Sequence, residues 1–231
     1  MLIHAPLLQP HTRGSLMVSK SFMFKPLAAA ALLAVASASQ AGITVYTSQS
    51  AFLAATTATG VDTYTGFSIT GTTPSPINRT AGPYAYTAST PNNFFGAGTT
   101  ANPWLSTNNA TDSITFGSFS GGVSAAGGNF FGSDISGLFS AGDVTLTATD
   151  SLGATSTQTI VGATTSSFLG FVSTGTLTSL VLSAVQPTTP LWPTTDNLTL
   201  GLAAAVPEAQ TYAMMLAGLG LVGFMARRRR A

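Results

Sequence analysis

The stretch Val144-Thr-Leu-Thr-Ala-Thr149 gives the clearest structural signal in the chain. Valine, leucine and alanine alternate with threonine, and this period of two is typical of a β-strand with one buried face. Asp150-Ser-Leu-Gly153 then supplies turn-forming residues, and Thr155-Ser-Thr-Gln-Thr-Ile-Val161 continues as a second strand. The pattern therefore predicts a β-hairpin.

The surrounding segment, residues 42–205, has the composition of a β protein. It is rich in Thr, Ser, Gly and Ala, and it contains no lysine and no glutamate, which long amphipathic helices need on their wet face. Further strands are expected at Ile43 to Thr47, Tyr64 to Ile69, Ser113 to Phe116, Phe168 to Val172, Leu177 to Val185 and Leu198 to Leu202. We therefore predict a mostly β fold, an antiparallel β-sandwich or jelly roll.

Turns and one helix complete the expected domain. Turn signals lie at Gly71 to Pro76, Pro91 to Asn93, Gly121-Gly122, Gly127-Gly128 and Pro187 to Pro193. Ser48 is expected to cap a short helix that carries Ala51-Phe-Leu-Ala-Ala55 and ends before Gly60.

The charges of residues 42–205 exclude several classes of function. One arginine, Arg79, and six aspartates give this segment a net charge of −5, so we expect no electrostatic binding of nucleic acid. The segment also lacks His, Cys and Lys. This absence excludes Ser-His-Asp and Cys-His catalysis, lysine Schiff bases and the usual zinc sites.

Carboxylate chemistry remains open. A secreted polysaccharide-active hydrolase would need two of the aspartates to face a sugar across about 5 to 9.5 Å, but none of them lies in a recognisable catalytic motif. Calcium is a second use of carboxylates, and Asp134 and Asp196 are its candidate ligands. The competing interpretation is that these aspartates cap turns.

Aromatic residues offer a route to carbohydrate binding. Trp104 and Trp192 lie beside Pro103 and Pro193, in segments expected to be loops, where an indole ring is available to stack on a sugar. The competing interpretation is that these rings fill the ends of the sandwich.

The N-terminal residues 1–41 have the pattern of a signal peptide. Lys20 and Lys25 precede an apolar run from Pro26 to Ala38, and small residues lead to a predicted cleavage between Ala41 and Gly42. We expect the true start to be Met17 or Met23.

The C-terminal residues 206–231 have the pattern of a membrane-sorting tail. Its parts are a polar start (Val206, Pro207, Glu208), an uncharged stretch from Thr211 to Ala226, and four arginines (Arg227, Arg228, Arg229, Arg230). As a helix, the uncharged stretch would be about 24 Å long, somewhat short for a bilayer core of about 30 Å. Arginines are costly within the core, so the cluster should stop the helix at the cytoplasmic face.

This order of parts resembles the PEP-CTERM sorting signal of Gram-negative envelope proteins, although Ala209 stands where that family usually has proline. The resemblance implies processing by an exosortase, a protease of the inner membrane, and export to the envelope or the extracellular space. Some PEP-CTERM proteins have a jelly-roll ectodomain, and parts of this chain resemble them: Ile43-Thr-Val-Tyr46, Asp112-Ser-Ile-Thr-Phe116, the hairpin at 144–161, Phe168-Leu-Gly-Phe171 and Asp196-Asn-Leu-Thr-Leu200. We therefore expect a non-enzymatic exopolysaccharide- or biofilm-associated protein with a structural or carbohydrate-binding role.

Overall fold

The hairpin predicted around Val144 is present in the computed structural model, which describes residues 42–205 and 209–228. Its strands are β11 (Gly142–Asp150) and β12 (Thr155–Ala163). The turn forms because Asp150 Oδ1 accepts the backbone N–H groups of Leu152 and Ala154 at 2.9 and 2.8 Å. On the outer face, threonine hydroxyls pair across the strands at 2.9 Å, Thr145 with Thr159 and Thr147 with Thr157.

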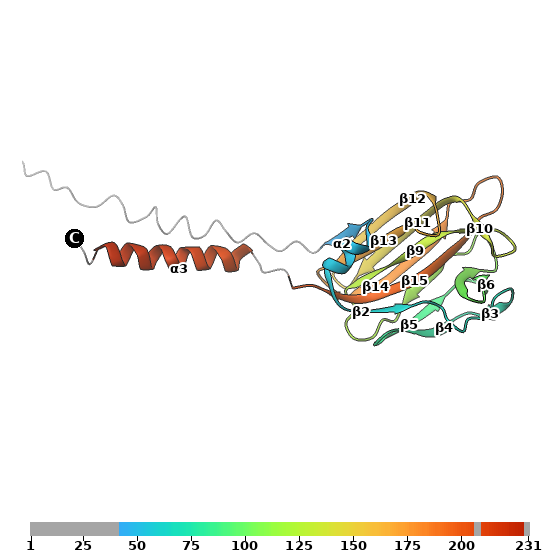
Figure 1. Ribbon diagram of the computed structural model, residues 1–231, viewed down its shortest axis with the longest axis horizontal. Helices are drawn as coiled ribbons and strands as arrows, with labels where there is room; N and C mark the ends of the chain where they lie inside the picture. The colour runs from blue at the N-terminus through green and yellow to red at the C-terminus, as the bar shows by residue number, and fades with distance from the viewer. Residues whose placement is uncertain (1–41, 206–208, 229–231) are drawn as a thin grey trace, which may run out of the picture. The chain divides into compact units, whose positions relative to one another are not determined.

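Residues 42–205, which we call the β domain, form two antiparallel sheets (Figure 1). Sheet A contains β1 (Ile43–Tyr46), β2 (Thr56–Asp62), β3 (Thr72–Pro74), β6 (Asn93–Thr99), β7 (Asn102–Thr107), β9 (Ala125–Ser133), β10 (Phe139–Ser140), β13 (Phe168–Ser173) and β15 (Trp192–Ala203). Sheet B contains β4 (Ile77–Ala81), β5 (Tyr84–Ser89), β8 (Ile114–Gly117), β11, β12 and β14 (Leu177–Ala184). The predicted antiparallel β-sandwich is confirmed.

The chain crosses repeatedly between the two layers. Sheet A runs in the order β1-β13-β9-β15-β7-β6-β3, with β2 pairing with β15 and β10 with β9, and sheet B runs β12-β11-β14-β8-β5-β4. The consecutive strands β13, β14 and β15 therefore alternate between the two sheets, as consecutive strands do in jelly rolls. The inward side chains of both sheets form one core, to which the hairpin contributes Val144, Leu146 and Ala148.

The helix expected after Ser48 is present but short. It is α2 (Gln49–Ala54), and the Ser48 side chain accepts the N–H of Ala51. Its one buried residue, Phe52, packs against Gly170 of β13, where a Cβ atom would come within 2.4 Å of the Phe52 ring. This close approach seats the helix on sheet A.

The single cation of the β domain, Arg79, lies between the sheets. Its Nε and Nη2 donate to Asp62 Oδ2 and Oδ1 at 2.6 and 2.7 Å, and the Tyr86 hydroxyl donates to the same carboxylate at 2.7 Å. Burial alone would lower the pKa of Arg79, but the hydrogen bonds and charge of Asp62 raise it above its usual value. Burial also raises the pKa of Tyr86. The group is therefore a partly buried ion pair, with Asp62 buried and Arg79 19% exposed, that links β2 in sheet A to β4 and β5 in sheet B.

The strand predicted at Tyr64 to Ile69 is wrong, because this segment is a loop. Asp62 Oδ1 accepts the Tyr64 N–H at 2.8 Å, and Tyr64 takes a left-handed conformation with φ of 54°. A following turn, with a 2.9 Å bond from the Phe67 N–H to the Tyr64 carbonyl, carries the chain away from an extended path. A side-chain cap overrides the strand-forming tendency of these residues.

The turn predicted at Gly127-Gly128 is also wrong, because both residues lie inside the central strand β9. A Cβ at Gly127 would come within 3.0 Å of the Gly170 Cα on β13, and one at Gly128 would come within 3.2 Å of the Asp196 carbonyl oxygen on β15. Glycine is needed because the backbones approach closely, which a sequence does not distinguish from a turn. The other predicted strands correspond to β1, β8, β13, β14 and the second half of β15.

The predicted tail helix is present as α3 (Ala209–Arg228), with Arg227 and Arg228 in its last turn. Cations at this end are favourable because they face the negative end of the helix dipole. Among the helices that the structure describes, none is long and apolar enough to be identified as a membrane span. The predicted signal peptide, Ala41, Val206, Pro207, Glu208, Arg229 and Arg230 lie outside the described residues.

Candidate functional site

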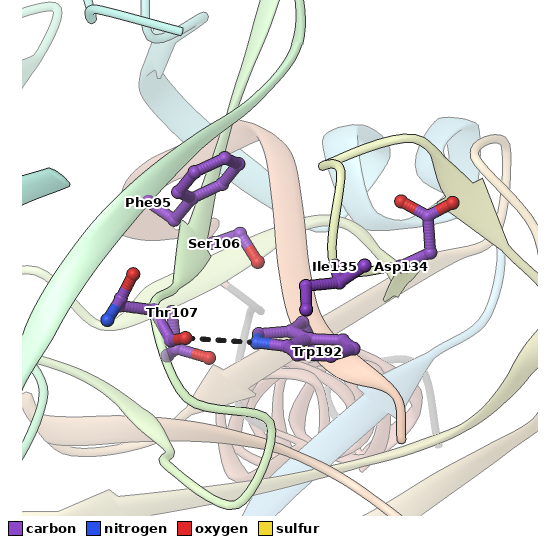
Figure 2. Close-up of a pocket in the computed structure, with 7 residues that line it drawn as sticks. Phe95, Ser106, Thr107, Asp134, Ile135 and Trp192 are labelled. Carbon is purple, nitrogen blue, oxygen red and sulfur yellow. Dashed lines mark hydrogen bonds between the residues drawn. The ribbon is translucent and has the colours of Figure 1, made fainter. Parts of the chain in front are cut away.

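A small pocket in the β domain brings together aromatic, apolar and polar side chains. It has a volume of about 190 Å³ and is lined by Phe95, Ser106, Thr107, Asn108, Asp134, Ile135 and Trp192. Phe95 comes from β6, Ser106 and Thr107 from β7, Trp192 from the start of β15, and Asp134 and Ile135 from the connection that leaves β9. Figure 2 shows the rings of Phe95 and Trp192 with the Ser106 hydroxyl between them.

Trp192 is held in a fixed position. It pairs with Ser133 of β9 in the sheet register, and its indole N–H donates to the Asn108 carbonyl at 3.2 Å, the bond drawn in Figure 2. The ring is only partly buried. An apolar ring face presented at a fixed angle is suited to stacking on a flat ligand.

Asp134 shapes the opposite rim of the pocket. Its Oδ1 accepts the backbone N–H groups of Ser136 and Leu138 at 2.8 and 3.0 Å, closing a tight turn. This turn projects Ile135, which is 77% exposed, beside the pocket. The Asp134 Oδ1 atom therefore caps a turn, as the competing interpretation for the aspartates predicted.

Buried hydroxyls support the floor of the pocket. Ser106, Ser133 and Thr194 lie within 2.8 to 3.2 Å of one another, and the Ser106 hydroxyl also donates to the Pro193 carbonyl at 3.2 Å. These residues come from three neighbouring strands, so the bonds fix β7, β9 and β15 together next to the pocket-lining residue Ser106. Ser106 is the member of this group that reaches the pocket.

Trp104, the other predicted sugar-stacking residue, lies elsewhere. It is in strand β7 and not in a loop, and its ring packs edge-on against Phe131 with centroids 4.9 Å apart. The neighbouring Pro103 suggested a loop, but it is near the start of β7, where a strand tolerates proline. Trp104 thus packs against Phe131 and does not line the pocket, whereas Trp192 does. Sugar stacking by either ring stays a prediction.

The structure does not bring Asp134 and Asp196 together. Asp196 pairs with Asn129 near the middle of β9, whereas Asp134 follows the end of that strand. Both Asp196 oxygens bond to Asn197, through its backbone N–H at 2.7 Å and its side-chain amide at 3.0 Å, and burial raises the pKa of Asp196. No cluster of three or more metal-ligating side chains occurs in the described residues. Calcium binding at Asp134 or Asp196 stays a prediction.

The six aspartates of the β domain all accept hydrogen bonds that serve the fold. Asp62 holds Arg79, Asp112 accepts from Asn92, and Asp143 accepts the Gly162 N–H. Asp134 and Asp150 accept backbone N–H groups of their own turns, and Asp196, inside β15, accepts from the next residue, Asn197. Each of these carboxylates therefore takes part in a hydrogen bond within the β domain.

The sequence revealed Trp192 and Asp134 but missed the other residues of the pocket. Strands β6 and β7 supply three of them. Neither strand shows a clear alternation of apolar and polar residues, because β6 contains two glycines and the second residue of β7 is proline. Phe94-Phe95 after the turn at Pro91 was the one available signal, since Phe94 is buried and Phe95 faces the pocket.

Comparison with known proteins identifies the tail. Residues 205–230 match the family model described as the PEP-CTERM protein-sorting motif. No curated protein and no solved structure matches the chain. The motif indicates an exported protein that is sorted by an exosortase, with transient anchoring in the membrane before it reaches the surface.

Proposed function

We propose that the β domain is a non-enzymatic carbohydrate-binding module of the cell envelope or biofilm matrix, and that the Trp192 pocket holds one sugar unit of the producer's own exopolysaccharide. The observation that carries this proposal is the combination of a fixed, partly exposed indole face with hydroxyl, amide and carboxylate groups in one hollow. A sugar ring has one apolar face and a rim of hydroxyls, so it matches both features. The sorting tail directs the domain to a location where such polymers occur.

The size of the pocket limits the ligand. At about 190 Å³ it is smaller than the roughly 300 to 1,000 Å³ of pockets for drug-sized ligands. It would therefore contact a single ring, either a chain end or one residue of an exposed polymer. A contact area of this size supports weak binding, which many copies on one surface would strengthen through multivalency.

The charge of the β domain favours neutral glycans. Its net charge of −5 repels anionic polymers unless a cation lies between the two. A glycan array probed with the protein, once with calcium and once with chelator, tests the proposal. We expect neutral glycans to be retained under both conditions and anionic glycans only with calcium. Retention of no glycan in either condition would refute carbohydrate binding.

One assay distinguishes the proposed binding function from the alternative, a polysaccharide hydrolase. The producer's exopolysaccharide is incubated with the protein, and release of reducing ends is followed over time. We expect binding without release, because the carboxylates are committed to the fold. Release that disappears on Asp134→Asn would instead establish the enzyme.

A further inference from the structure

Strand β12 leaves a long edge of sheet B without a partner. It has nine residues, pairs with β11 on one side, and is the last strand in the order of its sheet. In Figure 1 it lies along the outer border of the β domain. Its outer row of backbone N–H and C=O groups is therefore free to pair with another strand.

The other strand edges of the β domain are short or covered. Strands β1, β3 and β10 have four, three and two residues, and β3 ends with Pro74. Strand β4 is covered by β2, because a Cβ atom at Gly60 would come within 2.2 Å of the Ala81 carbonyl oxygen. Among the described strands that have a partner on one side only, β12 is the longest, since β2, which pairs with β15 alone, has seven residues and lies beside β4.

The sequence of β12 lacks the charges and the proline that usually keep edges apart, and its one irregularity is a β-bulge opposite Asp143, where Gly162 has a φ of 60°. Natural edge strands carry lysine, other charges or proline, which discourage pairing between molecules. Thr155-Ser-Thr-Gln-Thr-Ile-Val-Gly-Ala163 has none of these, and it is rich in β-branched residues. Val161 is 79% exposed. Such an uncharged strand of high β-propensity is the type that pairs with a copy of itself.

We infer that β12 is a self-association edge, on which the β12 strand of a second copy pairs antiparallel and joins the two B sheets into one. Antiparallel pairing of identical strands is a closed two-fold contact, so each edge satisfies the other. The neutrality of β12 lets the edges meet although the domain as a whole is negative. The sorting tail delivers every copy to the same surface, which raises the local concentration of the partner strand.

This inference is independent of the Trp192 pocket, because pocket and edge share no residue. Loss of sugar binding would leave self-association unchanged. Likewise, a variant that blocks pairing at β12 would leave sugar binding unchanged.

The chain contains no cysteine, which permits a direct test. Seven variants of the full chain are made, each with one cysteine at a position from 155 to 161, and are expressed in a host that contains the sorting protease. In a two-fold antiparallel pair one residue lies opposite its own copy, at a Cα separation of about 4.5 to 5.5 Å that a disulfide spans. Any disulfide must join two molecules, so non-reducing gels report the contact.

We expect a cysteine at one position in β12 to give the strongest dimer band. Cysteines two residues away on either side should give weaker bands. Thr80→Cys on the covered strand β4 is the matched control and should remain monomeric. Adding Val161→Lys to the best cysteine variant should reduce the dimer several-fold, because it places a positive charge on the pairing edge of each copy, whereas Leu152→Lys in the hairpin turn should not. The inference would be overturned if Thr80→Cys gave as much dimer as the best β12 variant, or if no β12 variant gave a dimer.

Discussion

The Arg79 guanidinium holds the buried Asp62 carboxylate through two nitrogens, with Nε–Oδ2 and Nη2–Oδ1 distances of 2.6 and 2.7 Å. Asp62 ends β2 of sheet A, and Arg79 lies in β4 of sheet B. The guanidinium also lies over the Tyr64 ring, 5.1 Å from its centroid. The one cation of the domain is therefore used to join the two layers.

Replacing Arg79 by methionine should destabilise the β domain strongly. The change leaves the Asp62 carboxylate buried at 5% exposure without its counter-charge. Breaking a fully buried pair from one side costs about 3 to 5 kcal/mol, and this is the upper limit here because Arg79 is 19% exposed. Urea unfolding followed by circular dichroism measures the loss. Asp143→Asn, at a carboxylate that accepts one backbone N–H, is the control and should cost far less. A loss for Arg79→Met as small as that of the control would show that the pair does not tie the sheets.

Gly170→Ala should destabilise the domain through a steric conflict. The new Cβ would come within 2.4 Å of the Phe52 ring, and overpacking of this kind costs about 1 to 3 kcal/mol. Gly117→Ala is the control, because there the nearest atom would be 3.4 Å away. The midpoints of thermal unfolding of the two variants should differ clearly. Equal midpoints would mean that α2 moves away without cost.

Asp150 should make the domain sensitive to acid. The Ser173 hydroxyl, together with the backbone N–H groups of the turn, holds the pKa of Asp150 below its ordinary value despite its burial. The stabilisation from the charged form is complete above the unfolded pKa of about 3.9 and is lost as the pH falls through the lower folded value. The difference in unfolding free energy between wild type and Asp150→Asn should thus be largest near pH 7 and shrink below about pH 4. A difference that is constant with pH would contradict this assignment.

The parts predicted correctly from the sequence are those with strong local patterns. The alternation at Val144 to Thr149 identified the hairpin, and the alternating or apolar runs elsewhere identified five more strands. Errors arose where a distant neighbour decides the structure. Gly128 is in a strand because the backbone of β15 approaches it, and Trp104 is in a strand because β6 and Phe131 flank it. Of the seven pocket residues only Asp134 and Trp192 were predicted, because the pocket is formed by strands that become neighbours only through the sheet order.

The sorting tail should depend on its charged residues. Glu208→Ala, or replacement of the arginines from 227 to 230 by serine, should prevent processing, because the first removes the matched motif and the second removes the charges that fix the depth of the helix. Ala209→Pro should be tolerated or improve processing, since it restores the residue usual in the family. The measurement is the mobility of the chain on gels, in a strain with the exosortase and a strain without it. Identical mobility in both strains would mean that the exosortase does not process the tail, which would then act only as a membrane anchor.

Retention of the protein on the producer's own purified exopolysaccharide, measured for wild type, Trp192→Ala and Trp104→Ala, tests the central claim most directly. Trp192 lines the pocket, so its loss should abolish retention while the unfolding midpoint stays near that of wild type. Trp104 packs against Phe131 at 4.9 Å, so its loss should lower the midpoint while the folded fraction still binds. Retention of Trp192→Ala equal to that of wild type would contradict the account.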